Sequence, residues 1–270
     1  MKKRTLLVAL ALGVTGAFAQ DLTSKKGEKY LPETGDWSIG YNAEPILNLV
    51  GRVMGGSTSG TSLSNPMGYT NYITGKYYRD EKTAYRAAVG INFGSATQNQ
   101  LVPDVTSTST PPAMVKDSWK HSTNSITLGA GMEKRRGTTR LQGYYGAMVM
   151  FDFGGSDDSY KYGNALSSTN TFHTNTFSQG AGVTDNKAGS TLGVSLNGFI
   201  GAEYFIAPKI SVGAEYWWGI GFSSTGEGSM KTETWDASSS AATTTTVKTG
   251  GAGSFNLGNS VGMLLINLHF

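Results

Sequence analysis

The strongest constraint on the fold is a strict alternation of apolar and polar residues. From Ile210 to Phe222 every even position is apolar or aromatic, whereas the odd positions are mostly Ser, Gly and Glu. The same alternation runs from Leu192 to Ile206. Successive side chains of a β-strand point to opposite sides, so this period of two predicts strands with one apolar and one polar face.

Similar runs occur throughout the chain. Strands are predicted at residues 37–50, 69–79, 83–94, 123–135, 138–153, 191–206, 210–223 and 255–270. The connections after the second, fourth and sixth runs are very short, and the other connections are long. This pattern predicts antiparallel hairpins with all the long loops at one end, including 95–122, 154–190 and 224–253. The fold class expected is all-β, an eight-stranded antiparallel up-and-down barrel.

The composition of the two faces indicates which face points outward. A soluble barrel keeps its large apolar side chains inside. Here one face is a nearly uncharged band of aliphatic and aromatic residues, and the other is rich in Gly, Ser, Asn, Thr and charged residues. That distribution is typical of a transmembrane barrel with a polar interior. The 37 glycines fit this interpretation, because inward glycines leave room for long side chains in a narrow lumen.

Pairing across the short connections gives the same assignment of faces. A turn centred on Glu81 places Tyr77 opposite Tyr85 outside and Lys76 opposite Arg86 inside. A two-residue turn at Arg136-Gly137 would place Leu128 opposite Tyr145 outside, and Glu133 opposite Arg140 inside. The inward charged residues are then Glu44, Lys76, Arg86, Glu133, Arg140, Glu203 and Glu215. Because isolated ions are costly in a medium of low dielectric constant, we expect these residues to form a paired network that closes the lumen.

The first residues have the features of an export signal. Lys2, Lys3 and Arg4 precede a short apolar run, and Ala17-Phe18-Ala19 matches a signal-peptidase site. We therefore expect a signal peptide at 1–19, a short periplasmic segment at 20–35 and the barrel at 36–270. The leader holds three of the 22 basic residues and no acidic residue, which leaves 19 basic against 19 acidic residues. A neutral mature chain gives no reason to expect nucleic acid as a partner.

Residues suited to catalysis or metal binding are sparse. The chain has no cysteine, and its histidines, His121, His173 and His269, are far apart in the sequence. No metal or cofactor site is predicted, and we expect a protein that is not an enzyme.

The C-terminus resembles the assembly signal of bacterial outer-membrane barrels. Leu264, Ile266, Leu268 and Phe270 share one face, and the chain ends on an aromatic residue. With the strand count, the chain is similar to the small barrels of the OmpA and OmpX type, and Gln20 after the leader resembles exported proteins of the Bacteroidota. The resemblance implies location in the outer membrane, contact with its lipids and lipopolysaccharide, insertion by the barrel-assembly machinery, and a structural and surface-interaction role.

Two other roles stay open from the sequence. One is a small pore for ions or polar solutes. The other is a lipid-modifying enzyme, because some eight-stranded outer-membrane barrels carry a histidine and a serine near the outer leaflet, and His121-Ser122 imitates such a pair. Trp119 and Trp235 fall in predicted loops, where exposed tryptophans are frequent interface residues, so they are the candidates for contact with an extracellular partner.

Overall fold

The computed structural model describes residues 22–43 and 72–270, and every regular element in this part of the chain is a β-strand. The strands are β1 (Trp37–Asn42), β2 (Tyr72–Asp80), β3 (Thr83–Pro103), β4 (Met114–Arg136), β5 (Leu141–Lys161), β6 (Val183–Lys187), β7 (Thr191–Ala207), β8 (Ile210–Thr225), β9 (Gly228–Asp236), β10 (Ala241–Thr249) and β11 (Ala252–His269). Within these ranges, no helix has the length and apolar character needed to cross a membrane.

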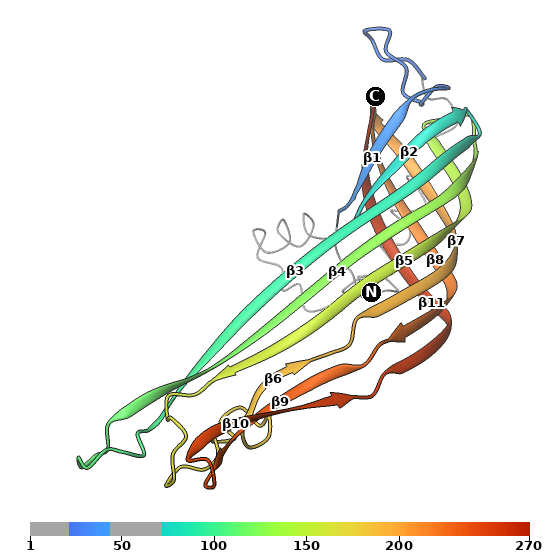
Figure 1. The fold of residues 1–270 in the computed structure, drawn as a ribbon. Helices are drawn as coiled ribbons and strands as arrows, with labels where there is room; N and C mark the ends of the chain where they lie inside the picture. Colours follow the sequence, from blue (N-terminus) through green and yellow to red (C-terminus); the bar gives the residue numbers. More distant parts are fainter. Residues whose placement is uncertain (1–21, 44–71) are drawn as a thin grey trace, which may run out of the picture.

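Eight of the strands close into a ring. The hydrogen-bonded order is β5-β4-β3-β2-β1-β11-β8-β7, and β7 pairs back with β5. All neighbours are antiparallel, and the backbone groups of Trp37 and Phe270 bond to each other at the closure between β1 and β11. The prediction of an eight-stranded antiparallel up-and-down barrel is therefore confirmed (Figure 1). The second half of the first predicted strand, including Glu44, lies outside the described residues.

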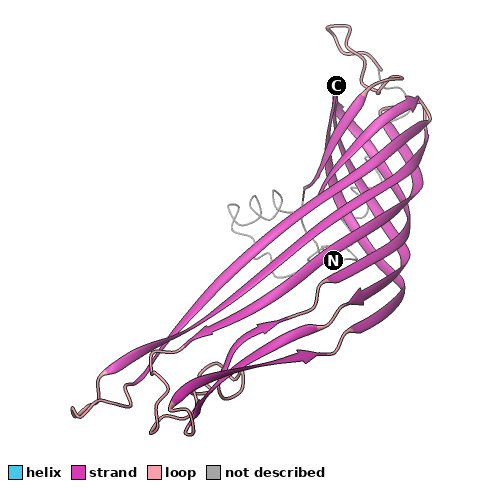
Figure 2. Cartoon of the chain, in the orientation of Figure 1, coloured by secondary structure: helices cyan, strands magenta, loops and turns pink. Residues whose placement is uncertain are grey.

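Three strands continue far beyond the ring. β3, β4 and β5 contain 21, 23 and 21 residues, and β5 leaves β7 after the pair Gly154–Thr191. It then pairs with β6, which continues through β9 to β10. We call this projecting sheet the extension: 95–103 of β3, 114–122 of β4, 155–161 of β5, and β6, β9 and β10. Figures 1 and 2 show it as a twisted sheet that leaves one end of the barrel.

The extension corrects the prediction of long loops. Strands make up most of the predicted loops 95–122 and 224–253 and smaller parts of 154–190, and the low-complexity run 238–246 is β10 and the turn before it. These segments are rich in Ser, Thr, Asn and Lys, and they lack the regular apolar face by which strands were recognised. Their backbone ladders form without a continuous apolar face, because the neighbouring strand supplies the hydrogen-bond partners.

The register of the hairpins was predicted correctly at one turn and wrongly at another. Tyr77 pairs with Tyr85 and Lys76 with Arg86, as expected. Leu128, however, pairs with Phe151 instead of Tyr145. The connection between β4 and β5 contains four residues, 137–140, instead of two, and it begins with Gly137 at a φ of 128°. The register shifted by an even number of residues, so the assignment of faces was preserved.

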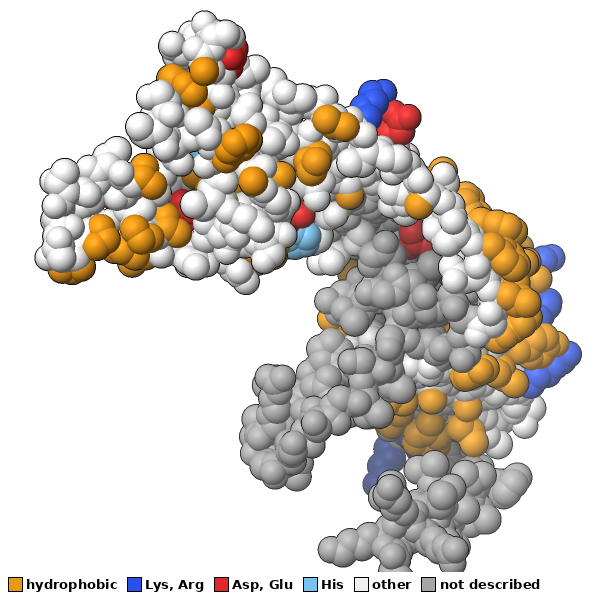
Figure 3. Space-filling view, turned by 90° about the horizontal axis from the view of Figure 1, so that it is seen from below, with side chains coloured by type: hydrophobic (Ala, Val, Ile, Leu, Met, Phe, Trp, Pro, Cys, Tyr) orange, Lys and Arg blue, Asp and Glu red, His pale blue; other side chains and the backbone are white. Residues whose placement is uncertain are grey.

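The outward face of the barrel is apolar and the inward face is buried. Exposed apolar side chains of the ring include Ile39, Ile73, Val89, Leu128, Val149, Leu196, Ile200, Val212 and Trp218. Exposed aromatic residues flank them: Trp37, Tyr85 and Phe270 lie at the short-turn end, and Phe93, Phe151, Phe153, Phe222 and Phe255 lie towards the extension. In Figure 3 hydrophobic side chains gather over the barrel wall, whereas the extension shows mostly polar atoms with smaller hydrophobic patches.

The lumen is less polar than the sequence predicted. A layer of buried side chains crosses it: Ala88, Tyr144, Met148, Met150, Phe199, Trp217 and Met263. Inward glycines make room for this layer. A Cβ on Gly146 would lie 2.6 Å from Phe199 Cζ, and one on Gly129 would lie 2.3 Å from Met150 Sδ. The glycines thus accommodate aromatic and thioether side chains as well as charged ones.

Candidate functional site

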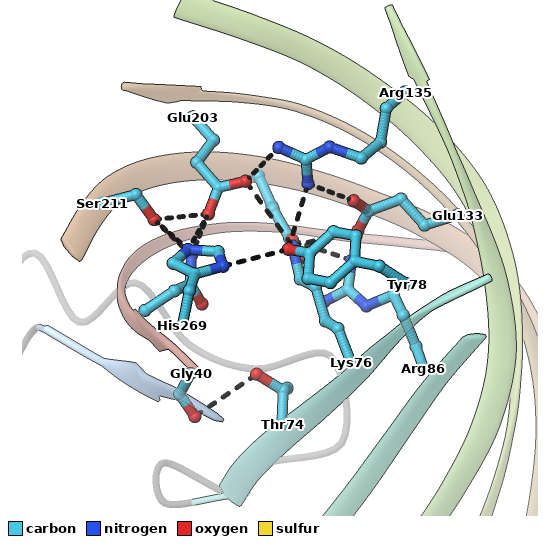
Figure 4. A network of polar contacts seen from close by, with 12 residues as sticks. Gly40, Thr74, Lys76, Tyr78, Arg86, Glu133, Arg135, Glu203, Ser211 and His269 are labelled. Atoms are coloured by element: carbon cyan, nitrogen blue, oxygen red, sulfur yellow. Dashed lines mark hydrogen bonds and ion pairs between the residues drawn. The ribbon is translucent and has the colours of Figure 1, made fainter. Parts of the chain in front are cut away.

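Six ionisable side chains meet inside the barrel near its short-turn end. We call them the lumen cluster: Lys76 of β2, Arg86 of β3, Glu133 and Arg135 of β4, Glu203 of β7 and Glu215 of β8. Three carry positive charge and three carry negative charge, and every one of the side chains is buried. Figure 4 shows five of them, Lys76, Arg86, Glu133, Arg135 and Glu203, converging from different strands into one network. The alternation of each strand directs these side chains inward, and ring closure brings them together.

Glu133 lies at the centre of the lumen cluster. Its Oε1 accepts a hydrogen bond from Arg135 Nη1 at 2.8 Å. Its Oε2 lies 3.0 Å from Lys76 Nζ and 3.3 Å from Arg86 Nη1. One carboxylate therefore faces three cations, which stabilises its ionised form despite its burial.

Arg86 and Glu215 form a bidentate pair on the side of the lumen cluster that faces the apolar layer. Arg86 Nη1 and Nη2 lie 2.8 and 3.3 Å from the two oxygens of Glu215. Trp217 Nε1 donates to the same carboxylate at 2.8 Å. The guanidinium also lies over the Phe199 ring, 4.3 Å from its centroid. Charge pairing and cation–π contact thus connect the lumen cluster to the apolar layer.

Glu203 is surrounded by donors at the short-turn end of the lumen cluster. Arg135 Nη2 lies 2.7 Å from its Oε2, and its Oε1 accepts hydrogen bonds from Ser211 Oγ at 2.5 Å and Asn267 Nδ2 at 2.6 Å. His269 Nε2 lies 3.5 Å from the same Oε1 (Figure 4). A buried carboxylate with this many partners has its desolvation largely compensated.

The structure brings together five of the seven predicted lumen residues. These are Lys76, Arg86, Glu133, Glu203 and Glu215, whereas Glu44 lies outside the described residues. Arg135 is a member of the lumen cluster that was not predicted from the sequence. Arg135 follows Glu133 by two residues on β4, so the two side chains point to the same side of the strand. The alternation therefore indicated that Arg135 also points inward. It was overlooked because the strand was expected to end at that residue.

The prediction for Arg140 was wrong. Arg140 lies in the turn between β4 and β5, where Nε donates to Phe205 O at 2.8 Å and Nη2 to Ile206 O at 2.9 Å. Its guanidinium also lies over the Tyr30 ring, 4.0 Å from the centroid. The four-residue turn moves Arg140 out of the ladder and away from Glu133. Its contacts join the end of β7 to the N-terminal segment, which lies over this end of the barrel (Figure 1).

The two candidate tryptophans lie on strands of the extension instead of in loops. Trp119 belongs to β4 and Trp235 to β9, and both side chains are half-buried. His121 lies near Trp119, and its Nδ1 is 2.8 Å from Asp158 Oδ1. Because His121 and Ser122 are adjacent on a strand, their side chains point to opposite faces, so the structure does not bring this pair together.

The described residues contain no group of three or more His, Asp and Glu side chains arranged to hold a metal ion.

Comparisons with known proteins show similarity to solved structures alone. No protein-family model matches the chain, and no curated protein matches it. Among solved structures, the chain is similar to the outer membrane protein OprG from Pseudomonas aeruginosa, with a TM-score of 0.38 and 13% sequence identity over 89% of this chain and 98% of that chain. A TM-score this low carries no argument about the fold. The barrel is established by the hydrogen-bonded strand order alone.

Proposed function

We propose that this chain is an integral outer-membrane barrel of the small OmpA and OmpX type, with a closed lumen and a structural and surface-interaction role. One observation carries the proposal: the closed ring exposes an apolar band to its surroundings while ionised side chains are buried inside it. In water this arrangement would expose a large apolar surface. In a bilayer the same band contacts hydrocarbon and is stabilised.

Strand length and aromatic residues support the orientation. About 9–11 tilted residues suffice to cross a bilayer, yet β4 contains 23. The surplus forms the extension, which we assign to the cell exterior. The short-turn end, with the N-terminal segment, then faces the periplasm. The exposed aromatic residues at both ends of the band match the interfacial positions that Trp, Tyr and Phe occupy in membrane barrels.

This location implies the partners of the protein. The apolar band would contact outer-membrane lipids and lipopolysaccharide. Leu264, Ile266 and Leu268 share one side of β11, Phe270 follows its last residue, and Leu268 and Phe270 are exposed. They are available as the signal that the barrel-assembly machinery would recognise. The extension would carry the contact with an extracellular partner, and we assign neither a cofactor nor a catalytic role.

The contents of the lumen oppose a pore. The lumen cluster and the adjacent apolar layer are both buried, and cation–π contacts join them. Eight strands leave an interior only wide enough for side chains to fill. An open path would require a buried charge pair and a layer of large side chains to separate, at substantial energetic cost.

Two measurements test the proposal. The purified chain, folded in detergent, should migrate differently on a gel before and after boiling, because a closed barrel resists unfolding by the cold detergent. Reconstituted in a planar bilayer, the folded chain should give no stable channels of uniform size. Identical migration would contradict the membrane barrel, and uniform open channels would contradict the closed lumen.

A further inference from the structure

Two pairs of side chains stand side by side on the extension, where β4 and β5 continue beyond the barrel. Trp119 is directly opposite Tyr160, and His121 is directly opposite Asp158. The β4–β5 ladder has no register shift between these pairs and Thr127–Asp152, two residues whose side chains are buried inside the barrel. All four side chains therefore lie on the side of the sheet that continues the lumen face.

Asp158 is held in place but not saturated with hydrogen bonds. Its Oδ1 accepts a hydrogen bond from Trp119 Nε1 at 2.8 Å and lies 2.8 Å from His121 Nδ1. Within the described residues both of these contacts use Oδ1, and the carboxylate is partly exposed. When His121 Nδ1 donates to Asp158, the other ring nitrogen of the neutral imidazole is an acceptor. The pair therefore offers two acceptors fixed in position.

Three aromatic rings form a wall beside this pair. The ring centroids of Trp119, Tyr160 and Phe177 lie 6.2 to 6.4 Å from one another, and all three side chains are half-buried. Phe177 comes from the connection between β5 and β6, where its backbone N donates to Gln179 Oε1 at 2.9 Å. Burial, followed by the charge of Asp158, raises the pKa of Tyr160 above its ordinary value of 10.0. Its hydroxyl is therefore neutral at physiological pH and can both donate and accept.

An uncharged cavity adjoins the same stretch of the sheet. It has a volume of 390 Å³, and its lining includes Asn92, Thr123, Asn124, Ser125, Ser156 and Thr191. Thr123 follows His121 by two residues on β4, and Ser156 precedes Asp158 by two residues on β5, so both share the face of the pair. The volume falls within the range of small-ligand sites. Hydroxyl and amide groups there provide both donors and acceptors.

We propose that Trp119, His121, Asp158, Tyr160 and Phe177 bind a neutral saccharide of about two rings, with the remainder of the sugar in the adjoining cavity. A sugar ring has an apolar face that packs on aromatic rings and a rim of hydroxyls that donate to fixed acceptors. The site supplies both features side by side. The residues that line the adjoining cavity are uncharged, so the cavity supplies hydroxyl and amide groups but no charge for an ionic ligand.

The inference rests on the proposed function, which places the extension outside the cell. The saccharide would then come either from the lipopolysaccharide core of the same membrane or from free glycans. Both sources contain uncharged hexose rings, and such a ring is the chemistry that the site would recognise.

The test uses the full chain, purified free of lipopolysaccharide, in detergent. The probes are maltose, lactose, N,N′-diacetylchitobiose and core oligosaccharide released from lipopolysaccharide, and binding is read by saturation-transfer NMR. We expect at least one probe to bind, and we expect Trp119→Ala and Asp158→Asn each to weaken its binding about tenfold or more. The matched control is Lys120→Ala, one residue from Trp119 on the opposite face of β4, which should bind like the unaltered chain.

Each outcome has a defined meaning. Binding of core oligosaccharide alone supports the site and assigns the sugar to the cell's own membrane, whereas binding of the disaccharides supports it and assigns free glycans. No binding by a chain that still shows the shift on boiling overturns this inference and leaves the membrane barrel intact. Equal binding by Trp119→Ala, or displacement of the sugar by millimolar choline but not by glucose, also overturns it.

Discussion

Arg135 Nη2 and Glu203 Oε2 lie 2.7 Å apart in the lumen, although the two residues are 68 positions apart in the chain. Arg135 is on β4 and Glu203 is on β7, and β5 separates these strands in the ring. Arg135 and Glu203 are therefore not neighbours in any ladder of the sheet, and pairing of adjacent strands cannot bring them together. It forms only when the wall curves, so the interaction depends on closure of the barrel.

Glu203→Gln should strongly destabilise the barrel. The substitution removes the carboxylate that faces Arg135 and Lys76. The buried lumen cluster then holds three positive charges and two negative charges. Removing one partner of a buried ion pair costs about 3–5 kcal/mol, because the other charge keeps its desolvation penalty. Unfolding by guanidinium in detergent, followed by tryptophan fluorescence, measures the change in the free energy of unfolding.

The control for this variant is Glu227→Gln. Glu227 forms an ion pair of 2.9 Å with Lys248, and both side chains are well exposed in this pair. Exposed pairs contribute only about 0–1 kcal/mol, so the control should unfold almost like the unaltered chain. If both variants lost the same free energy of unfolding, burial would not be the reason that the lumen cluster stabilises the barrel.

Gly146→Ala should prevent correct packing of the wall. A Cβ there would lie 2.0 Å from the backbone oxygen of Met132 and 2.6 Å from Phe199 Cζ. Overpacking of this kind costs about 1–3 kcal/mol or more, and a backbone oxygen in a ladder has little room to move. Gly198→Ala is the control, since its nearest contact would be 3.8 Å away. The folded fraction on unheated gels should fall for the first variant alone, and an equal fraction for both would contradict the packing argument.

The sequence predicted the parts of the fold in which apolar and polar side chains alternate from one residue to the next. The ring strands have that difference, so their number, their faces and five lumen residues could be recognised from alternation alone. The extension lacks it, because both faces of β10 carry small polar residues such as Thr243 and Thr244. No apolar face distinguishes such a strand from a polar loop, and its pairing with β9 depends on backbone groups common to every residue.

The length of the β4–β5 connection was the second feature that the sequence did not predict. The pair Arg136-Gly137 looks like a two-residue turn, but Thr139 Oγ1 donates to Leu141 O at 3.1 Å and Gln142 Nε2 donates to Thr139 O at 2.6 Å. These local bonds stabilise a longer connection that the residue types alone did not indicate. Arg140 was therefore placed in the lumen, and Arg135 was overlooked.

Deleting residues 228–249 should leave the barrel folded. The deletion removes β9 and β10, which in the described part of the chain pair with each other, with β6 and, through one bridge at Thr234, with Phe172 of the β5–β6 connection. The last ring pair, Thr225–Ala252, would be connected through the four remaining residues 226, 227, 250 and 251. The gel shift on boiling should persist. If the shortened chain no longer forms a shifting species, the extension is needed for folding of the ring.

Arginine on the outward face should destabilise the barrel in proportion to its depth in the bilayer. Ile200 is 61% exposed and pairs with Tyr145 and Tyr216 between the two sets of flanking aromatic residues, so Ile200→Arg would place a charge in hydrocarbon. The expected cost near the midplane is about 2–4 kcal/mol, measured by denaturant unfolding in lipid vesicles. Val247→Arg is the matched control: Val247 is 51% exposed, but it lies on β10 of the extension, in water, where the charge should cost little. Because both positions are exposed apolar sites on strands, only the surrounding medium distinguishes them. Equal effects at the two positions would mean that the apolar band does not contact lipid.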